Sequence, residues 1–269
     1  MKVLTYPNRL AGGQRLLHYL KTLGVQYTDD INAKGVTHVH HYNFSNKRVL
    51  PESLIPFKDK GIKIINEHLE NIKKDHIDDV FTKVFGYSLR LDPTTHRGMC
   101  GVKSTQNAIH FMKLIECPIK AYQVDNEPRY SKSGEPHYRM YVKFIDTRIS
   151  KDRIRDWRIV VMGNKPVYLF EKHIESDCLT HVAKDKYFKV FGYEDWESKF
   201  SAEEVDNIKA FILRANIDFG EIDILRDNST GLIYIIDIND VPASAIWNHA
   251  DNSDEILNYL SSKYKECYL

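Results

Sequence analysis

The feature that most constrains this chain lies near its C-terminus, where two apolar runs flank a turn-rich segment. The runs cover residues 219–226 and 232–241, and the sequence DNSTG separates them at 227–231. Apolar runs joined by a short polar segment containing Gly are typical of a β-hairpin. Pro242 follows the second run and ends it, because proline cannot donate to a strand ladder.

The predicted hairpin brings three oxygen-bearing side chains together. If the strands pair symmetrically about residue 230, Asp223 lies opposite Asp237, and Asn239 shares the face of Asp237. Carboxylates directly opposite on a sheet are about 5 Å apart at Cβ and repel each other, so we expect a cation between them. Oxygen ligands of this kind suit Mg²⁺. The alternative is an ordinary solvated hairpin face.

The same residues resemble the metal-binding end of the ATP-grasp superfamily. Those enzymes carry an acidic residue on one strand and Glu-x-Asn, followed by proline, on the next. The resemblance implies that Asp223, Asp237 and Asn239 hold one or two Mg²⁺ ions that bridge the phosphates of ATP. Asp237 stands where the family more often has Glu, and its shorter side chain reaches less far.

The composition argues against several other classes of protein. Lys and Arg number 38 and Asp and Glu 37, a formal net charge of +1, so overall charge does not favour nucleic acid or an anionic membrane. The 4 cysteines show no CxxC spacing, which indicates neither a zinc site nor a disulfide framework. No apolar run approaches about 18 residues and no apolar leader begins the chain. We therefore expect a cytoplasmic protein with no membrane segment.

The first 75 residues have α/β character. Strands are expected at 3–6, 36–42 and 61–66, and helices at 14–23 and 69–85. No G-x-G-x-x-G fingerprint occurs, so a Rossmann dinucleotide site is not supported. His38 and His40 would share a strand face, but without Cys or carboxylate at ligand spacing a structural role is expected rather than a metal. The arrangement resembles the small domain that precedes the nucleotide-binding part of ATP-grasp proteins.

A lysine closes the next predicted strand, 98–104. The resemblance implies that Lys103 meets the α- and β-phosphates of ATP, a role that suits a compact ammonium charge; the alternative is a surface lysine. A Gly-rich phosphate-covering loop should follow and is missing. Ser104, Thr105 and Asn107 occupy its place, and their polar groups can donate to phosphate instead.

Two further segments are interpreted through the same resemblance. Residues 120–137 contain two prolines and a glycine and are predicted to be an exposed loop that acts as a lid. The alternating segment 138–146 is predicted to be a strand. The resemblance implies that backbone groups of Tyr141, Val142, Lys143 and Phe144 bind adenine; the alternative is a plain core strand.

A second hairpin is predicted around Gly163-Asn164, which lies between two apolar runs. The residues from Arg155 to Val167 resemble the Asp-x-Arg strand of the family and its following strand. The resemblance implies that Arg158 contacts the reacting acyl phosphate or γ-phosphate, since its planar fork fits two oxygens at once. Lys172 is a second candidate for the γ-phosphate.

The remaining segments complete the expected order of elements. Residues 175–200 mix aromatic and basic residues, a composition that can bind single-stranded nucleic acid, but acidic residues share the stretch and a packed loop is preferred. Ser201 is expected to cap a helix at 205–215, and a closing helix is expected at 253–264.

Together these observations predict an α+β protein with an ATP-grasp fold and a small N-terminal α/β preliminary domain. The expected divisions are 1–75, 76–145 with the lid, and 146–269 with the metal-binding hairpin. The resemblance implies an ATP- and Mg²⁺-dependent ligase that activates a carboxylate as an acyl phosphate for attack by an amine or another nucleophile. A phosphotransferase on the same scaffold and a non-catalytic nucleotide-binding or interaction protein remain as alternatives.

Overall fold

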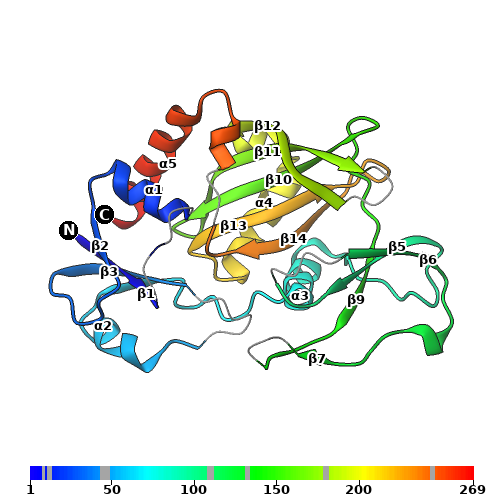
Figure 1. Cartoon of the computed structure of the whole chain (residues 1–269), viewed down its shortest axis with the longest axis horizontal. Helices are drawn as coiled ribbons and strands as arrows, with labels where there is room; N and C mark the ends of the chain where they lie inside the picture. The colour runs from blue at the N-terminus through cyan, green and yellow to red at the C-terminus, as the bar shows by residue number, and fades with distance from the viewer. Residues whose placement is uncertain are drawn as a thin grey trace.

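The computed structural model describes residues 1–7, 10, 14–42, 49–107, 112–130, 134–177, 182–242 and 246–269, and only the backbone of 176–177 and 182–188. These residues form a four-stranded, a five-stranded, a three-stranded and a two-stranded sheet (Figure 1). Helices and strands are both abundant, which confirms the α+β class. No helix in the described part of the chain is long and apolar enough to cross a membrane.

The elements follow in chain order. The helices are α1 (Arg15–Thr22), α2 (Ile55–Asp59), α3 (Lys74–Phe85), α4 (Ala202–Arg214) and α5 (Ser253–Tyr268), and the 3₁₀ turns are η1 (Glu52–Leu54), η2 (Ala121–Gln123), η3 (Trp196–Lys199) and η4 (Ile246–His249). The strands are β1 (Lys2–Tyr6), β2 (Gln26–Thr28), β3 (Val36–His41), β4 (Lys63–Ile65), β5 (Gly98–Ser104), β6 (Met112–Cys117), β7 (Arg129–Tyr130), β8 (Pro136–His137), β9 (Arg139–Lys143), β10 (Arg153–Met162), β11 (Lys165–Asp177), β12 (Val182–Tyr193), β13 (Phe219–Arg226) and β14 (Ile233–Asn239).

The N-terminal sheet has the order β2-β1-β3-β4, and all its pairs are parallel. Parallel neighbours need crossover connections, which α1 and α2 supply, so the expected α/β character is confirmed. The helix expected at 69–85 begins only at Lys74. The side chain of Asn71 accepts the Lys73 N–H at 2.9 Å, and this local bond competes with an earlier helical start.

The two histidines of β3 contribute to packing against the C-terminal helix. Nε2 of His38 and Nε2 of His40 each lie 2.9 Å from the hydroxyl of Tyr264 on α5. Burial, aided by Lys63, lowers the pKa of His38 to about 4, so the ring is neutral at pH 7. The pair therefore ties the N-terminal sheet to α5 through a shared tyrosine.

The small sheet has the order β6-β5-β9 with antiparallel pairs. The strand predicted at 98–104 is confirmed as β5, whereas β6 was not predicted. The segment 120–137, expected to be a loop, contains η2 and the β7–β8 pair. The Asp125 carboxylate binds the Arg129 guanidinium there, with 2.5 Å between Oδ2 and Nη2, so part of this segment is held by its own contacts.

The large sheet has the order β12-β11-β10-β13-β14, and every pair in it is antiparallel. Its last two strands are the predicted hairpin, and Asp223 pairs with Asp237 as expected. Gly163 and Asn164, at φ 61° and 59°, form the predicted turn between β10 and β11. The prediction of a packed loop at 175–200 is wrong, because this stretch contains the end of β11 and the whole of β12, which adds another strand to the β10–β11 hairpin.

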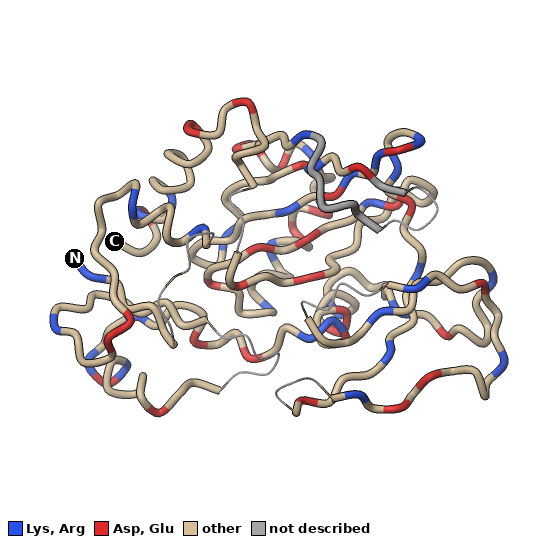
Figure 2. Tube along the Cα trace, in the orientation of Figure 1, with Lys and Arg blue, Asp and Glu red and all other residues tan. Residues whose placement is uncertain are grey.

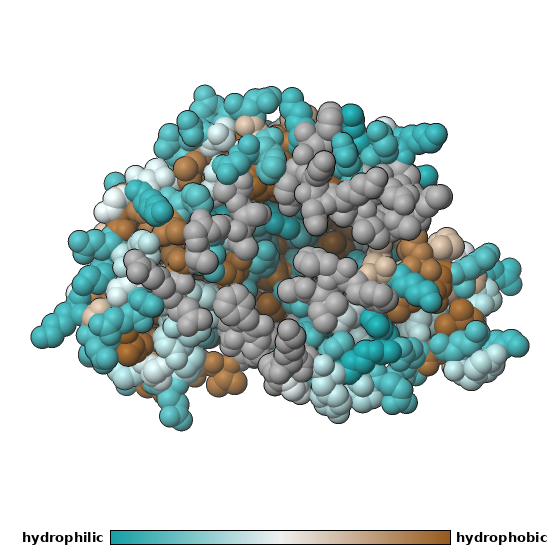
Figure 3. All heavy atoms as spheres, viewed as in Figure 1, coloured by the Kyte–Doolittle hydropathy of each residue, from teal (hydrophilic) through white to brown (hydrophobic). Residues whose placement is uncertain are grey.

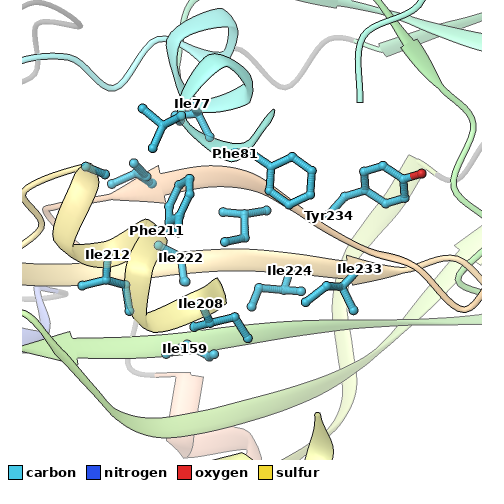
Figure 4. Packing of buried hydrophobic residues seen from close by; sticks show 14 of the residues in the cluster. Ile77, Phe81, Ile159, Ile208, Phe211, Ile212, Ile222, Ile224, Ile233 and Tyr234 are labelled. Carbon is cyan, nitrogen blue, oxygen red and sulfur yellow. The ribbon is translucent and has the colours of Figure 1, made fainter. Parts of the chain in front are cut away.

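The main core lies between the large sheet and helices α3 and α4 (Figure 4). Ser201 caps α4 as predicted: its Oγ accepts the Glu204 N–H at 3.2 Å, and the Glu204 carboxylate accepts the Ser201 N–H at 2.9 Å. Fully buried residues of α4 such as Phe211 then pack on Ile222 and Ile224 of β13. This packing commits one face of β13 to the core and leaves the other for polar residues.

A buried asparagine joins the N-terminal sheet to the large sheet. The side chain of Asn66, directly after β4, donates to the carbonyl of Phe219 at 2.7 Å and accepts the N–H groups of Asp218 and Phe219 at 3.1 and 2.9 Å. Its backbone φ of 63° is left-handed, which Asn tolerates better than most residues. The start of β13 is therefore held against the end of β4. The three divisions expected from the sequence stay a prediction, and the boundary at 75–76 falls inside α3.

We predict that Asn66→Ala lowers the free energy of unfolding by about 2–4 kcal/mol, since three buried hydrogen bonds are worth about 1 kcal/mol each and Ala resists a positive φ. Chemical denaturation measures this change. Asn66→Gly is the matched control, because it also loses the side chain but accepts the backbone angle. A stability loss in Asn66→Ala below about 0.5 kcal/mol, the range of ordinary surface substitutions, would contradict this role for Asn66.

Candidate active site

Three strands of the large sheet place three charged side chains in one row. Arg158 on β10 pairs with Asp223 on β13, and Asp223 pairs with Asp237 on β14. The row lies on the face opposite α4, because Ile222 and Ile224 on either side of Asp223 point into the core under α4. We call these residues, Arg158, Asp223 and Asp237, the central row.

Arg158 binds Asp223 through two parallel contacts. Its Nε lies 2.5 Å from Oδ1 and its Nη2 2.8 Å from Oδ2, the bidentate geometry that favours arginine over lysine. Burial acts to raise the pKa of Asp223, but Arg158 and Lys172 outweigh it and hold the pKa below its ordinary value. The sequence predicted a cation between the two carboxylates. For Asp223, that cation is the guanidinium of Arg158.

Lys172 belongs to the same network of charges. It is 3% exposed, and its Nζ lies 2.8 Å from Oδ1 of Asp156 and 3.7 Å from Oδ1 of Asp223. Burial raises the pKa of Asp156, and Lys172 opposes that rise. The ammonium thus offsets two buried carboxylates, and a contact between Lys172 and a γ-phosphate stays a prediction.

Asp237, at the end of the central row, faces lysines from other elements. Burial raises the pKa of Asp237 to about 6, and Asp223 adds to the rise while Lys74 and Lys103 oppose it. Burial, with Lys74 nearby, lowers the pKa of Lys103 to about 8 against the opposing charge of Asp237. Two ammonium groups, from α3 and β5, therefore lie near one partly buried carboxylate.

Lys74 was not singled out in the sequence as a site residue. It starts α3, and its backbone N–H donates to the carbonyl of Thr105 at 2.8 Å. This bond joins the start of α3 to the segment after β5, and so brings Lys74 close to Lys103. The pair Lys73-Lys74 at a helix start was the available signal, but many helices carry lysines there.

The residues expected to replace a Gly-rich loop make contacts within the protein. Ser104 Oγ lies 2.9 Å from Nδ1 of His137, and Thr105 Oγ1 accepts the Tyr138 N–H at 3.0 Å. Asn107 donates through Nδ2 to the carbonyl of Ile238 on β14 at 2.9 Å, beside Asp237. The segment after β5 is thus attached to the edge of the large sheet; residues 108–111 lie outside the described part of the chain.

The donor atoms of the central row fit a divalent cation in part. Mg²⁺ is commonly bound by one or two carboxylates together with water and phosphate oxygens. Asp237 suits this role, because it is partly buried opposite a second carboxylate, Asp223, and a nearby positive charge would offset both effects. Asp223 would share its oxygens with Arg158, and Asn239 Oδ1 already accepts the Val241 N–H at 3.2 Å. Among the described residues no group of three or more His, Cys, Asp or Glu side chains could hold a metal.

The strand predicted to bind adenine is paired along both of its edges. β9 pairs with β5 on one side. On the other, Tyr141 accepts the Leu91 N–H at 3.1 Å and Lys143 donates to the Leu89 carbonyl at 2.9 Å. Adenine binding by Tyr141 or Lys143 would require these bonds to open. Val142 packs in the core, and Phe144 lies beyond the last β5–β9 pair. Adenine recognition by these four residues stays a prediction.

Two residues that the sequence did not single out complete the charged face. Glu221 lies on the face of Asp223, two residues earlier on β13, with 3.4 Å between its Oε2 and Nη1 of Arg158. Its Oε1 also binds Nη1 of Arg15, the first residue of α1. Because side chains alternate between the two faces of a strand, Glu221 could have been placed on the face of Asp223 from the sequence. No local pattern connects Arg15 with this sheet.

The figures show where this charged face lies. Figure 2 shows acidic positions along β13 and β14, at the β14 edge of the large sheet, and basic positions on the elements around them. Figure 3 shows the same side of the molecule, where hydrophilic and hydrophobic residues both surround a hollow near the centre. Asp223 and Asp237 are among the acidic positions of these two strands.

Comparison of the chain with known proteins gives a likeness in structure and none in sequence. No protein-family model matches it, and no curated protein matches it. The structure is similar to that of the ATP-grasp ligase PsnB complexed with a minimal precursor, with a TM-score of 0.57 at 12% identity over 97% of this chain and 98% of that one. Another structure of PsnB contains the minimal precursor, Mg and ADP.

Two other solved structures are similar to that of this chain. D-alanine–D-alanine ligase from Bacillus anthracis, complexed with ATP, aligns with a TM-score of 0.55 at 10% identity over 100% of this chain and 95% of that one. The macrocyclase MdnC from Microcystis aeruginosa MRC, bound with its precursor peptide MdnA, aligns with a TM-score of 0.51 at 13% identity over 97% and 98%. At such identities the likeness shows the fold.

We predict that Asp237→Asn stabilises the ligand-free protein at pH 8 by about 2–3 kcal/mol. The pKa of Asp237 is raised from 3.8 to about 6, and a pKa shift of one unit corresponds to about 1.4 kcal/mol. A raised carboxylate pKa contributes stability that is present below the ordinary value of 3.8 and is lost as pH rises through about 6. Asn resembles the protonated acid and avoids that loss. Urea unfolding at pH 8 and at pH 4.5 measures the difference, which should shrink at the lower pH.

Asp206→Asn is the matched control, because Asp206 is exposed on α4. Its free energy of unfolding should differ from that of the parent by the same small amount at both pH values. Equal stability of Asp237→Asn and the parent at pH 8 would show that burial does not destabilise the charged form of Asp237.

Proposed function

Because the chain has the ATP-grasp fold, we propose that it is an ATP- and Mg²⁺-dependent ligase that joins a carboxylate to an amine or another nucleophile. The observation that carries this proposal is the central row, Arg158, Asp223 and Asp237, with Lys74 and Lys103 beside its acidic end. Phosphoryl transfer needs mainly positioning and charge neutralisation, and these five residues supply both.

In the proposed reaction a carboxylate oxygen of the substrate attacks the γ-phosphorus of ATP and ADP leaves. The product is an acyl phosphate. A nucleophile then attacks its carbonyl carbon, loses a proton and expels inorganic phosphate. No covalent bond to the protein is formed, so the side chains act by binding and orienting the reacting groups.

The residues divide between nucleotide and reacting centre. Lys103 and Lys74 would hold phosphate oxygens, and their mutual repulsion would fall when those anions bind. Arg158, oriented by both oxygens of Asp223, would present positive charge to the reacting phosphoryl group, and Lys172 would support it. Asp237 would hold Mg²⁺ with Asp223 and Asn239 as further ligands. Bound Mg²⁺ supplies charge neutralisation of the phosphates.

The structural neighbours suggest which substrates to test. PsnB and MdnC are described in complex with peptide precursors, and D-alanine–D-alanine ligase acts on a single amino acid by its name. We therefore propose acidic peptides and free amino acids, D-alanine included, as the first panel. The cytoplasmic location expected from the sequence stays a prediction.

The first test of this proposal is release of ADP and phosphate in the presence of the panel. A ligase releases both only when carboxylate and nucleophile are present, and mass spectrometry detects the joined product. A phosphotransferase releases ADP and yields a phosphorylated acceptor instead. A non-catalytic nucleotide-binding protein binds ATP and releases neither product, which would exclude the proposed activity.

We predict that ATP with Mg²⁺ raises the melting temperature of the parent and that Asp237→Asn removes most of the rise. A ligand at 100 times its dissociation constant stabilises the native state by about 2.7 kcal/mol, and for a chain of this size each kcal/mol is about 2–4 °C. Differential scanning fluorimetry measures the shift. The exposed-surface control Asp206→Asn should keep the full shift. Equal shifts in the two variants would remove Asp237 from the metal site.

We predict that Arg158→Lys keeps the fold but loses at least about 90% of kcat. The ammonium retains the charge but cannot contact both oxygens of Asp223 at once, so its position relative to the reacting phosphoryl group is no longer fixed. Stabilisation of the transition state then falls, and each 1.4 kcal/mol of lost stabilisation is about tenfold in rate. Steady-state kinetics with the best substrate of the panel measures this. Turnover within about threefold of the parent, less than 1 kcal/mol, would argue against a catalytic role for Arg158.

A further inference from the structure

The face that carries the central row holds a longer chain of alternating charges. It begins on α1, in the N-terminal part of the protein, and continues over β13, β10 and β11. Each member contacts a residue of opposite charge, and the members in order are Arg15, Glu221, Arg158, Asp223, Lys172 and Asp156. Five of the six belong to the large sheet, and Arg15 alone comes from another part of the fold.

Arg15 is held firmly in this place. It is 1% exposed, and its backbone N–H donates to the carbonyl of Pro242 at 3.0 Å. Its guanidinium lies over the rings of Phe170 and Trp247, at 5.2 and 5.4 Å from their centroids. Such contacts fix the direction of the side chain. The guanidinium of Arg15 is thus placed against the carboxylate of Glu221 on the sheet.

Glu221 lies between two guanidinium groups. Its Oε1 binds Nη1 of Arg15, and its Oε2 lies 3.4 Å from Nη1 of Arg158. Arg158 uses Nε and Nη2 for Asp223, so its third nitrogen faces Glu221. The carboxylate is 1% exposed, and a buried charge that loses its partner is costly. Without Arg15, Glu221 would draw the guanidinium of Arg158 toward itself and away from Asp223.

We propose that Arg15 is a positioning residue for the reaction: by neutralising Glu221 it keeps the fork of Arg158 on Asp223 and aimed at the reacting phosphoryl group. This inference rests on the proposed function, because it assumes that Arg158 acts on that group. The contact of Arg15 with Glu221 links α1 to the face of the large sheet that carries the central row, through charge as well as through packing. Arg15 itself touches neither the nucleotide nor the substrate in this proposal.

The test compares Arg15→Met with Arg15→Met/Glu221→Met. The single variant leaves Glu221 charged, so Arg158 should move and kcat should fall about 10- to 100-fold, as misplacement of a catalytic group does. The KM for ATP should stay within about twofold, because Lys74 and Lys103 hold the phosphates and the lost contact acts on the transition state. The double variant removes both charges, and kcat should return to within about threefold of the parent. Arg15→Lys, which keeps the charge, should also retain activity.

A second measurement needs no substrate. In the full chain labelled with ¹⁵N-arginine, the Nε–Hε signal of Arg158 is identified by its loss in Arg158→Lys. It should shift or broaden in Arg15→Met and return to its parent position in the double variant. If Arg15→Met does not fold, Arg15→Gln carries the same test, since its amide can still donate to Glu221 without charge.

Arg226→Met is the matched control. Arg226 pairs with Glu204 at 2.8 Å and lies over the rings of Trp157 and Phe200, at 5.1 and 5.9 Å, but has no contact with the alternating chain among the interactions of the described residues. It should lower stability without moving the Arg158 signal.

The outcomes separate this inference from the proposed function. An Arg158 signal that stays unchanged in Arg15→Met overturns the inference, whatever the activity shows. Failure of the double variant to restore the signal means that Arg15 acts by packing, which also overturns it. If the parent releases no ADP with any substrate but the signal moves and returns as expected, the proposed function fails while the link from Arg15 to Arg158 stands.

Discussion

The paired contact between Arg158 and Asp223 is the interaction on which the rest of this face depends. Two carboxylates opposite each other on neighbouring strands destabilise a hairpin, and β13 and β14 place Asp223 and Asp237 in that relation. Arg158 neutralises Asp223 from the next strand, with two contacts at 2.5 and 2.8 Å. The sheet can therefore keep Asp237 partly buried, although the positive charges near it offset only part of the effect of burial. Its pKa is accordingly raised to about 6. In the proposed function, this imbalance makes Asp237 the carboxylate that would hold Mg²⁺.

The groups around this contact come from distant parts of the chain, and a few polar contacts hold them in place. Asn66 joins the end of β4 to the start of β13, Asn107 joins the segment after β5 to β14, and Arg15 joins α1 to Glu221. Each link connects a smaller part of the fold to the large sheet. The large sheet, supported by the apolar core under α3 and α4, is the part of the fold to which all three links attach.

The structural likeness and the site geometry support different statements. At 10–13% identity the likeness to PsnB, D-alanine–D-alanine ligase and MdnC establishes the fold, and a fold alone does not determine an activity. The proposed ligase activity rests on the central row and the two lysines near it. The segment after β5 departs most from what the resemblance implied, because Ser104, Thr105 and Asn107 bind other parts of the protein.

Local patterns in the sequence determined the features that depend on neighbouring residues. The turn at 227–231 and the two-residue period of strands predicted the hairpin and its Asp223–Asp237 pair, but the structure reaches this pair only through a register shift between Asp223 and Ile224. Gly163-Asn164 and Ser201 marked a turn and a helix start that the structure contains. Only the tertiary structure decided which cation neutralises each carboxylate. Arg158 and Asp223 are 65 residues apart, and Arg15 and Glu221 are further apart still. Their meeting depends on the order of strands in the sheet and on how α1 packs, which no local periodicity encodes.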